Sequence, residues 1–217
     1  MNAPLRVDFI SDIACPWCVI GLRGLLQAIE ETGVAADIHF HPFELNPDMG
    51  PEGENTAEHV AKKYRSTREQ SQAVRQVLID RGAALGFTFN YDDESRIWNT
   101  FDAHRLLAWA AGEGQQLALK QALFKLNFAD RRSTSDHAAL LDAVREAGLD
   151  AERARAILIS EEFAAEVRAE ESLWRNRGVN AVPSIIFNQR WLVQGGQPPE
   201  TFAQAIRDIV SGAAKAG

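Results

Sequence analysis

The stretch that decides the fold is residues 5–18, LRVDFISDIACPWC, in which a short apolar run leads directly into two closely spaced cysteines. The run at residues 5–10 has the composition of a buried strand. The CPWC motif at residues 15–18 then begins a segment whose apolar residues recur at helical spacing, up to Gly33, where a helix would stop. The sequence therefore predicts a strand, a short connection, and a helix that starts at the cysteine pair.

The position of the first cysteine predicts its chemistry. Cys15 lies at the N-terminal edge of the expected helix, and Pro16 occupies the first helical position, which proline favours. Unpaired backbone N–H groups and the positive end of the helix dipole meet at that edge, so they favour the thiolate form of Cys15 over the thiol. We therefore expect Cys15 to be the thiolate that attacks a substrate disulfide.

The second cysteine is placed to complete that reaction. Cys18 follows three residues later on the same helical face, where the two Cα atoms are about 5–6 Å apart, a distance that suits a disulfide. Cys18 would then attack the mixed disulfide on Cys15 and release the product. A bond between the two cysteines closes too short a loop to stabilise the fold much, so its value lies in redox chemistry.

Two other interpretations of the cysteine pair are a structural zinc half-site and a pair of inert buried thiols. A zinc site needs more ligands, and His39 and His41 do not follow the spacing of zinc-finger ligands. Inert thiols do not normally bracket Pro-Trp at a helix start. Redox function is favoured over both, and we expect no metal site.

The composition narrows the class of protein. The chain has 217 residues, of which 46% are hydrophobic and 24% charged, enough for one large domain or two small ones. The net charge of -7 and the absence of a basic patch argue against nucleic-acid and membrane partners. Asp8 and Asp12 interrupt the only N-terminal apolar run, so no signal peptide is predicted and we expect a cytoplasmic location.

The rest of the chain predicts an α/β fold with a helical insertion. Outward from the cysteine motif we expect a second strand at 36–45 with Pro42 at an edge or bulge, a stretch that is helical almost throughout at 56–177, strands at 183–187 and 191–193, and a final helix that carries Phe202 and Ile209. Strand character returns only at residue 183. We divide the chain into a domain formed by 1–50 and 178–217 and an inserted helical domain at 51–177.

Two details within the insertion are expected from its pattern. Ile97, Phe101 and His104 fall on one face of a single helix. The acidic run at residues 92–94 precedes that helix and is interpreted as its N-terminal cap.

The histidines His39 and His41, in the expected second strand, alternate with apolar neighbours and are interpreted as surface or interlayer residues.

The chain resembles the DsbA-like thioredoxin-fold family, and within it the FrnE-like branch, which is related to 2-hydroxychromene-2-carboxylate isomerases and kappa-class glutathione transferases. The resemblance is carried by SDIACPWC at 11–18, Asn99 with AHR at 103–105, VNAVPS at 179–184 and GGQP at 195–198. It implies a thioredoxin-like fold with a large all-helical insertion between the second strand and a strand that begins at a cis-proline.

The resemblance also implies the composition of the site. Pro183 would have a cis peptide bond and lie beside the cysteines, which would leave the backbone of Val182 free to pair with an extended substrate. Val19 follows Cys18 where many FrnE-like relatives have an aromatic residue, so the shape of the groove differs while the dithiol chemistry is retained. The expected catalytic residues are Cys15 and Cys18, and the expected substrate-binding residues are Pro16, Trp17, Asn99, His104, Val182 and Pro183.

Two of these residues have a structural alternative. Trp17 either covers an apolar substrate surface or packs on a neighbouring helix. His104 lies on the apolar face of its helix, where a satisfied core histidine is the usual explanation, and the family pattern with Asn99 adds a role in lining the site.

The sequence thus predicts a thiol–disulfide oxidoreductase, a reductase or isomerase, that acts on protein or small-molecule disulfides as a monomer or homodimer. No tightly bound cofactor is expected, and glutathione is the expected redox co-substrate. The first alternative is a glutathione-dependent isomerase or transferase, in which Cys18 would be unnecessary. The second is a redox-inert binding module or chaperone, which would work without either cysteine.

Overall fold

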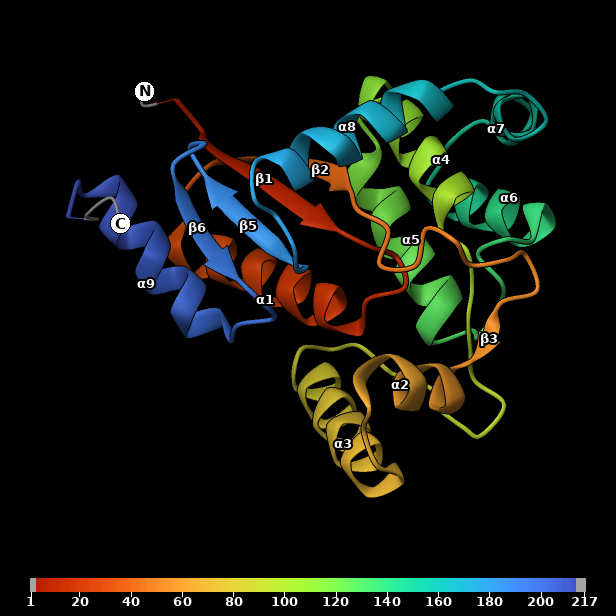
Figure 1. Cartoon of the computed structure of the whole chain (residues 1–217). Helices are drawn as coiled ribbons and strands as arrows, with labels where there is room; N and C mark the ends of the chain where they lie inside the picture. The colour runs from red at the N-terminus through yellow and green to blue at the C-terminus, as the bar shows by residue number, and fades with distance from the viewer. Residues whose placement is uncertain (1–2, 214–217) are drawn as a thin grey trace.

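The main sheet has four strands in the order β2-β1-β5-β6. In the computed structural model, residues 3–213 are described (Figure 1). The strands are β1 (Leu5–Ser11), β2 (Ala36–Pro42), β5 (Ser184–Phe187) and β6 (Trp191–Gln194). β1 pairs with β2 in parallel, while β5 is antiparallel to both β1 and β6. The first strand and the returning strands share one sheet, as the sequence predicts.

Two helices from opposite ends of the chain pack side by side and cover one face of this sheet (Figure 1). They are α1 (Pro16–Thr32) and α9 (Pro199–Val210), and each begins with proline in its first turn. α1 ends at Gly33, whose φ of +64° is the left-handed conformation that glycine adopts most readily. The predicted limits of the first helix are therefore confirmed.

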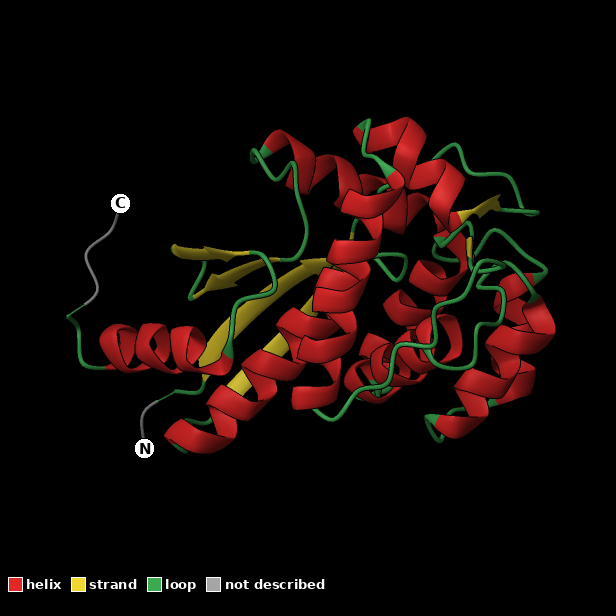
Figure 2. Ribbon diagram, turned by 90° about the horizontal axis from the view of Figure 1, so that it is seen from below, coloured by secondary structure: helices red, strands yellow, loops and turns green. Residues whose placement is uncertain are grey.

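The segment between β2 and β5 is mainly helical; most of it gathers beyond one end of the sheet, while its last helix packs against the sheet (Figures 1 and 2). Its elements are β3 (Glu54–Asn55), α2 (Thr56–Tyr64), α3 (Arg68–Ala84), β4 (Arg96–Ile97), α4 (Phe101–Gly112), α5 (Gln116–Phe128), α6 (His137–Glu146), α7 (Ala151–Leu158) and α8 (Ala164–Asn176). The expected large helical insertion is confirmed. The two-residue ladder between β3 and β4 is an addition that the sequence did not indicate.

The helical pattern is interrupted at residues 85–100, contrary to the sequence prediction. Gly86, with φ of +70°, lies just beyond the end of α3. Ile97 therefore lies in β4 and not on the helix with Phe101. The acidic run does not cap a helix: Asp92 accepts the Glu94 N–H at 2.9 Å in a turn that leads to β4. Buried Phe87 and Phe89 hold this irregular segment, so apolar packing and not helix periodicity explains its sequence.

Several shorter features agree with the sequence. β2 is an edge strand and ends at Pro42, three residues before the predicted end, because proline cannot donate to a ladder. The strands predicted at 183–187 and 191–193 are β5 and β6, and the turn between them has positive φ at Asn188 and Gln189. Asp136 caps α6 by accepting the Ala138 N–H at 2.9 Å.

One cluster of buried side chains runs through both predicted domains. It includes Phe9 of β1 and Phe202 of α9, and it continues to Leu106 of α4 and Leu140 of α6. The division into a thioredoxin-like domain and an inserted domain stays a prediction. None of the described helices is long and apolar enough to cross a membrane.

Candidate active site

The two cysteines lie at the N-terminus of α1 as free thiols. Cys15 is the N-cap residue, with extended backbone angles, and its carbonyl accepts the Cys18 N–H at 3.0 Å. Cys15 retains 4% of its surface and Cys18 none. The outer sulfur is thus the one that an approaching disulfide can reach, and the inner sulfur waits one turn further in.

The loop before β5 completes the surroundings of Cys15. The Cys15 thiol donates to the Val182 carbonyl oxygen at 3.5 Å, and the peptide bond between Val182 and Pro183 is cis, as the family resemblance implies. Among the described residues the Val182 N–H has no hydrogen-bond partner. That donor is available to an extended substrate segment lying beside the sulfur.

Two glycines allow the loops to approach α1 this closely. A Cβ atom at Gly21 would lie 2.9 Å from Cγ of Pro183, and one at Gly196 would lie 2.9 Å from the carbonyl oxygen of Trp17. Real side chains essentially never make contacts this short, so any larger residue would push the loops away from the helix. The GGQP sequence is therefore part of the structure that positions the dithiol.

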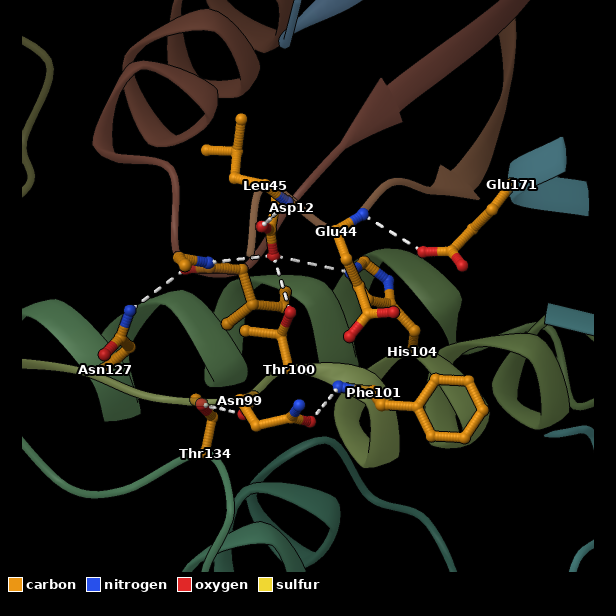
Figure 3. Close-up of polar contacts among 12 residues, drawn as sticks. Asp12, Glu44, Leu45, Asn99, Thr100, Phe101, His104, Asn127, Thr134 and Glu171 are labelled. Atoms are coloured by element: carbon orange, nitrogen blue, oxygen red, sulfur yellow. Dashed lines mark hydrogen bonds and ion pairs between the residues drawn. The ribbon is translucent and has the colours of Figure 1, made fainter. Parts of the chain in front are cut away.

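Asp12, three residues before Cys15, is the centre of a buried polar cluster (Figure 3). One carboxylate oxygen accepts the Ala14 N–H at 3.1 Å and the Thr100 hydroxyl at 2.8 Å, and the other accepts the Leu45 N–H at 2.7 Å. His104 lies 3.5 Å away, longer than an ordinary hydrogen bond. Asp12 therefore joins the cysteine loop, the end of β2 and the start of α4.

The pKa values of Asp12 and of the nearby Cys18 thiol are shifted in opposite directions. Burial opposes ionisation of Asp12, but His104 and the N–H groups of Leu45 and Ala14 outweigh it and hold its pKa below the ordinary value. Burial raises the pKa of the Cys18 thiol well above its usual range, and the neighbouring Cys15 raises it further. The inner sulfur thus needs help to lose its proton.

Trp17 is half-buried beside the cysteines and is covered by α3. The guanidinium of Arg81 lies 5.5 Å from the centre of the indole ring and donates to the Gly196 carbonyl at 3.2 Å. Trp17 therefore packs against a neighbouring helix and also forms part of the surface near the dithiol. Both interpretations of Trp17 are compatible with this position.

Two tyrosines from the insertion lie near Cys15, and no sequence pattern pointed to either. Burial raises the pKa of Tyr64 and of Tyr91, and the negative charge of a Cys15 thiolate raises both further. Tyr91 stacks on Phe89 with ring centroids 5.6 Å apart, which fixes its position. Tyr91 is half-buried, whereas Tyr64 keeps 60% of its surface exposed.

Asn99 and His104 contact different parts of the site. The Asn99 side chain donates to the Met49 carbonyl and accepts the Phe101 N–H, both at 2.9 Å, so its contacts fix a loop and the start of α4. His104 is 2% exposed, and among the described residues its Nε2 has no hydrogen-bond partner. His104 is thus not a satisfied core histidine, and the roles of both residues at the site stay predictions.

His41 lies at the interface between the sheet and α8. Its Nε2 is 2.9 Å from an Asp8 oxygen and its Nδ1 is 2.5 Å from a Glu170 oxygen, so it joins β1 to the insertion. His39 pairs with Asp37 at the surface. Within residues 3–213, no three His, Cys, Asp or Glu side chains come together as metal ligands would.

Comparison with known proteins agrees with this geometry. The sequence pattern of the DSBA-like thioredoxin domain matches residues 6–207. A probable DsbA oxidoreductase from Streptomyces coelicolor is 34% identical, with 98% of this chain and 92% of that chain covered and a TM-score of 0.88. No curated protein sequence matches the chain.

Two more distant structures share the fold. The cytosolic disulfide reductase DsbM from Pseudomonas aeruginosa, solved with GSH, is 18% identical over 95% of this chain and 99% of that chain, with a TM-score of 0.64. A 2-hydroxychromene-2-carboxylate isomerase is 12% identical over 97% and 100%, with a TM-score of 0.73. These likenesses concern the fold alone.

Proposed function

This chain belongs to the DSBA-like thioredoxin domain family, and on that premise we propose that it is a dithiol–disulfide oxidoreductase of the FrnE-like branch. Cys15 is the attacking thiolate and Cys18 the resolving thiol. The observation that carries the proposal is the position of Cys15, which caps α1 with its sulfur 3.5 Å from the carbonyl of the residue before cis-Pro183.

The reaction proceeds in two exchanges. The Cys15 thiolate attacks one sulfur of a substrate disulfide, forms a mixed disulfide and releases the other substrate sulfur as a thiolate. Cys18 then loses its proton and attacks the Cys15 sulfur, and the electron pair of the broken bond leaves with the second substrate sulfur. The substrate gains two electrons and two protons, and the enzyme is left with a Cys15–Cys18 disulfide.

The surroundings of Cys15 support binding of an extended or small substrate. Val182 offers an unpaired N–H beside the sulfur, and Trp17 and Pro16 are half-buried next to it. Pro183 fixes the direction of the loop. Both sulfurs come from one chain, so a monomer suffices for the reaction and a homodimer would carry two independent sites.

We further propose that the enzyme works as a reductase or isomerase in a reducing cytoplasm, with glutathione as the electron donor. A cytosolic disulfide reductase with GSH shares the fold, which supports this choice. Cys15 is only 4% exposed, which also favours a small tripeptide thiol over a folded protein as the electron donor. Glutathione would reduce the Cys15–Cys18 disulfide by the same exchange, ending as glutathione disulfide.

Cys15→Ser and Cys18→Ser are matched variants, because each replaces one sulfur with an oxygen and the two positions are three residues apart. Cys15→Ser is expected to abolish insulin reduction, because no thiolate remains at the helix terminus. Cys18→Ser is expected to capture substrate but hold it as a mixed disulfide, which mass spectrometry detects as added mass. Undiminished turnover by Cys15→Ser would refute the proposal.

A second candidate is a glutathione-dependent isomerase or transferase, which the shared fold of 2-hydroxychromene-2-carboxylate isomerase favours. In that case the protein would activate the sulfur of bound glutathione, and Cys18 would be dispensable. Calorimetric titration with glutathione, together with assay of Cys18→Ser, separates the two. Saturable binding with full activity in Cys18→Ser would favour the isomerase.

A further inference from the structure

Lys120 of α5 is a buried cation that packs on Phe40 and Phe124, two rings of the core cluster that also contains Cys15 and Cys18. Its side chain is 0% exposed, and among the described residues its ammonium has no hydrogen bond. The ring faces of Phe124 and Phe40 lie 5.1 and 5.9 Å from Nζ. An unpaired buried charge is costly, so a lysine here calls for a function that an apolar residue could not supply.

Lys120 also lines a cavity of about 200 Å³, on the side of the sheet edge formed by β2. The polar residues of the lining include His39, His41, His104, Glu166 and Glu170. His104 contributes a second buried nitrogen without a hydrogen bond, and Glu166 lies at the exposed end. The volume is several times the roughly 30 Å³ that a water molecule occupies, and polar groups at both ends suit water.

The resolving thiol has a need that this arrangement meets. Cys18 has no exposed surface, so bulk water cannot take its proton. Among the charged groups that act on Cys18, Lys120 favours the thiolate, and Cys18 is the group that acts most strongly on Lys120. The charged and titratable groups that face Lys120 are Cys15 and Cys18 from α1, Asp12 before α1, His39 and His41 from β2, His104 from α4, and Glu166 and Glu170 from α8.

We propose that Lys120 accepts the proton of Cys18 during resolution, and that the cavity which Lys120 lines carries this proton on to solvent. The inference rests on the proposed dithiol function. The neutral Lys120 amine becomes an ammonium as the Cys18 thiol becomes a thiolate. That thiolate bonds to the Cys15 sulfur, the substrate sulfur leaves with the electron pair, and Lys120 later returns its proton to the cavity water.

The acid–base properties of Lys120 fit this role. Burial lowers its pKa to about 8, against the opposing charges of Cys18, Asp12 and Cys15. When Cys15 is held in a mixed disulfide its negative charge is lost, which removes one of the influences that keep Lys120 protonated. The amine form therefore becomes more available at the step that needs it.

The test separates capture from resolution. Dipyridyl disulfide releases one coloured thiopyridone when Cys15 captures it and a second when Cys18 resolves the mixed disulfide, so stopped-flow absorbance reports both rates. Lys120→Met is expected to leave the first phase unchanged and slow the second about a hundredfold near neutral pH, as loss of a general base does. In the wild type the second phase rises with pH towards about 8, and in the variant its midpoint moves upward.

Two further variants make the test specific. Lys120→Arg keeps a positive charge that cannot be given up, so its second phase is expected to stay slow. Lys125→Met, which removes an exposed lysine of the same helix, is expected to leave both phases normal. Urea unfolding of Lys120→Met is expected to show no loss of stability, because the variant removes an unpaired buried charge.

Each outcome decides between the proposals. An unchanged second phase in Lys120→Met, or full recovery in Lys120→Arg, overturns the role of Lys120 as proton acceptor and leaves the dithiol function standing. Absence of capture by the wild type, with no effect of Cys15→Ser, would instead overturn the dithiol function and this inference with it. Slow resolution in both Lys120 variants with normal capture supports the proposal.

Discussion

Asp12 and Glu44 are two carboxylates with 1% side-chain exposure each, yet their acidities move in opposite directions. Asp12 receives two backbone N–H groups and a hydroxyl, and its pKa lies below the ordinary value. Burial and the like charge of Glu171 raise the pKa of Glu44 to about 7, although Arg168 contacts it. The side chains are equally enclosed, so the neighbours decide the direction: His104 and the N–H donors lower the pKa of Asp12, whereas the charge of Glu171 adds to the effect of burial on Glu44.

The difference arises within two consecutive residues of one loop. The Leu45 N–H donates to Asp12 at 2.7 Å, whereas the Glu44 N–H donates to Glu171 at 3.0 Å. The loop that follows β2 thus supplies one donor to the dithiol side and one to α8. On the dithiol side the donors stabilise the Asp12 carboxylate. On the α8 side Glu44 and Glu171 lie close together with fewer donors for their two carboxylates.

The largest expected effect comes from replacing Asp12. Asp12→Asn turns one acceptor oxygen into a donor that faces existing donors, and it removes the negative charge near Lys120. We expect a loss of about 4 kcal/mol in the free energy of unfolding, the scale for breaking a buried ion pair, measured by urea denaturation near pH 7. Asp48→Asn, at an exposed position, is the control and should be neutral. If Asp12→Asn lowers the free energy of unfolding by less than about 1 kcal/mol, the groups that donate to residue 12 do not need a negative charge there.

Glu44→Gln is expected to have an effect of the opposite sign. The folded pKa of Glu44, about 7, exceeds the ordinary glutamate value of 4.5, so the folded state binds the proton more tightly and wild-type stability falls as pH rises between these values. The variant should flatten this part of the profile and be about 2–3 kcal/mol more stable, relative to wild type, near pH 8 than near pH 4.

The measurement for Glu44→Gln is the free energy of unfolding at a series of pH values. Glu166→Gln, an exposed change on α8, should retain the wild-type slope. A parallel profile for Glu44→Gln and wild type would mean that Glu44 stays ionised, and the contrast with Asp12 would disappear.

The smallest effect is expected for His41→Asn, which tests the α8 side of the comparison. On α8, Glu170 and Glu171 are adjacent but face different partners. Glu170 pairs with His41, whose pKa is raised because Asp8 and Glu170 together outweigh its burial. This pairing stabilises the fold fully below the ordinary histidine pKa of 6.5, and the contribution is lost as pH rises through the higher folded pKa. His41→Asn should therefore cost about 1–2 kcal/mol near pH 6 and less near pH 9.

His39→Asn is the control for this variant, because His39 pairs with Asp37 at the surface. Thermal unfolding of both variants across the pH range gives the comparison. An equal loss at all pH values for His41→Asn would mean that the side chain contributes by packing on Trp174, whose ring lies 4.8 Å away, and not by charge.

The features predicted from sequence are those that depend on neighbours along the chain. The strand at residues 5–10 and the helix that begins at Pro16 and ends at Gly33 follow from local periodicity and capping. The cis bond before Pro183 follows from the family resemblance, since local physics does not favour it. The dithiol is predictable because its two cysteines are three residues apart.

The features that escape sequence reasoning depend on contacts between distant segments. Asp12 meets Thr100 and His104 only because α4 folds against the cysteine loop. The irregular segment at 85–100 resembles helix in sequence because the burial of Phe89 against Phe128 is not visible in a local pattern. No local signal marks Lys120, because α5 also contains Gln121, Lys125 and Asn127; only the structure shows that Lys120 is as buried as Leu119.

The near-complete enclosure of both sulfurs has a practical consequence for anyone who quantifies them. With 4% of Cys15 and none of Cys18 exposed, a bulky maleimide dye applied to the native protein would label fewer than two sites per molecule. The protein would then be mistaken for an oxidised preparation. Labelling in denaturant gives the correct titre.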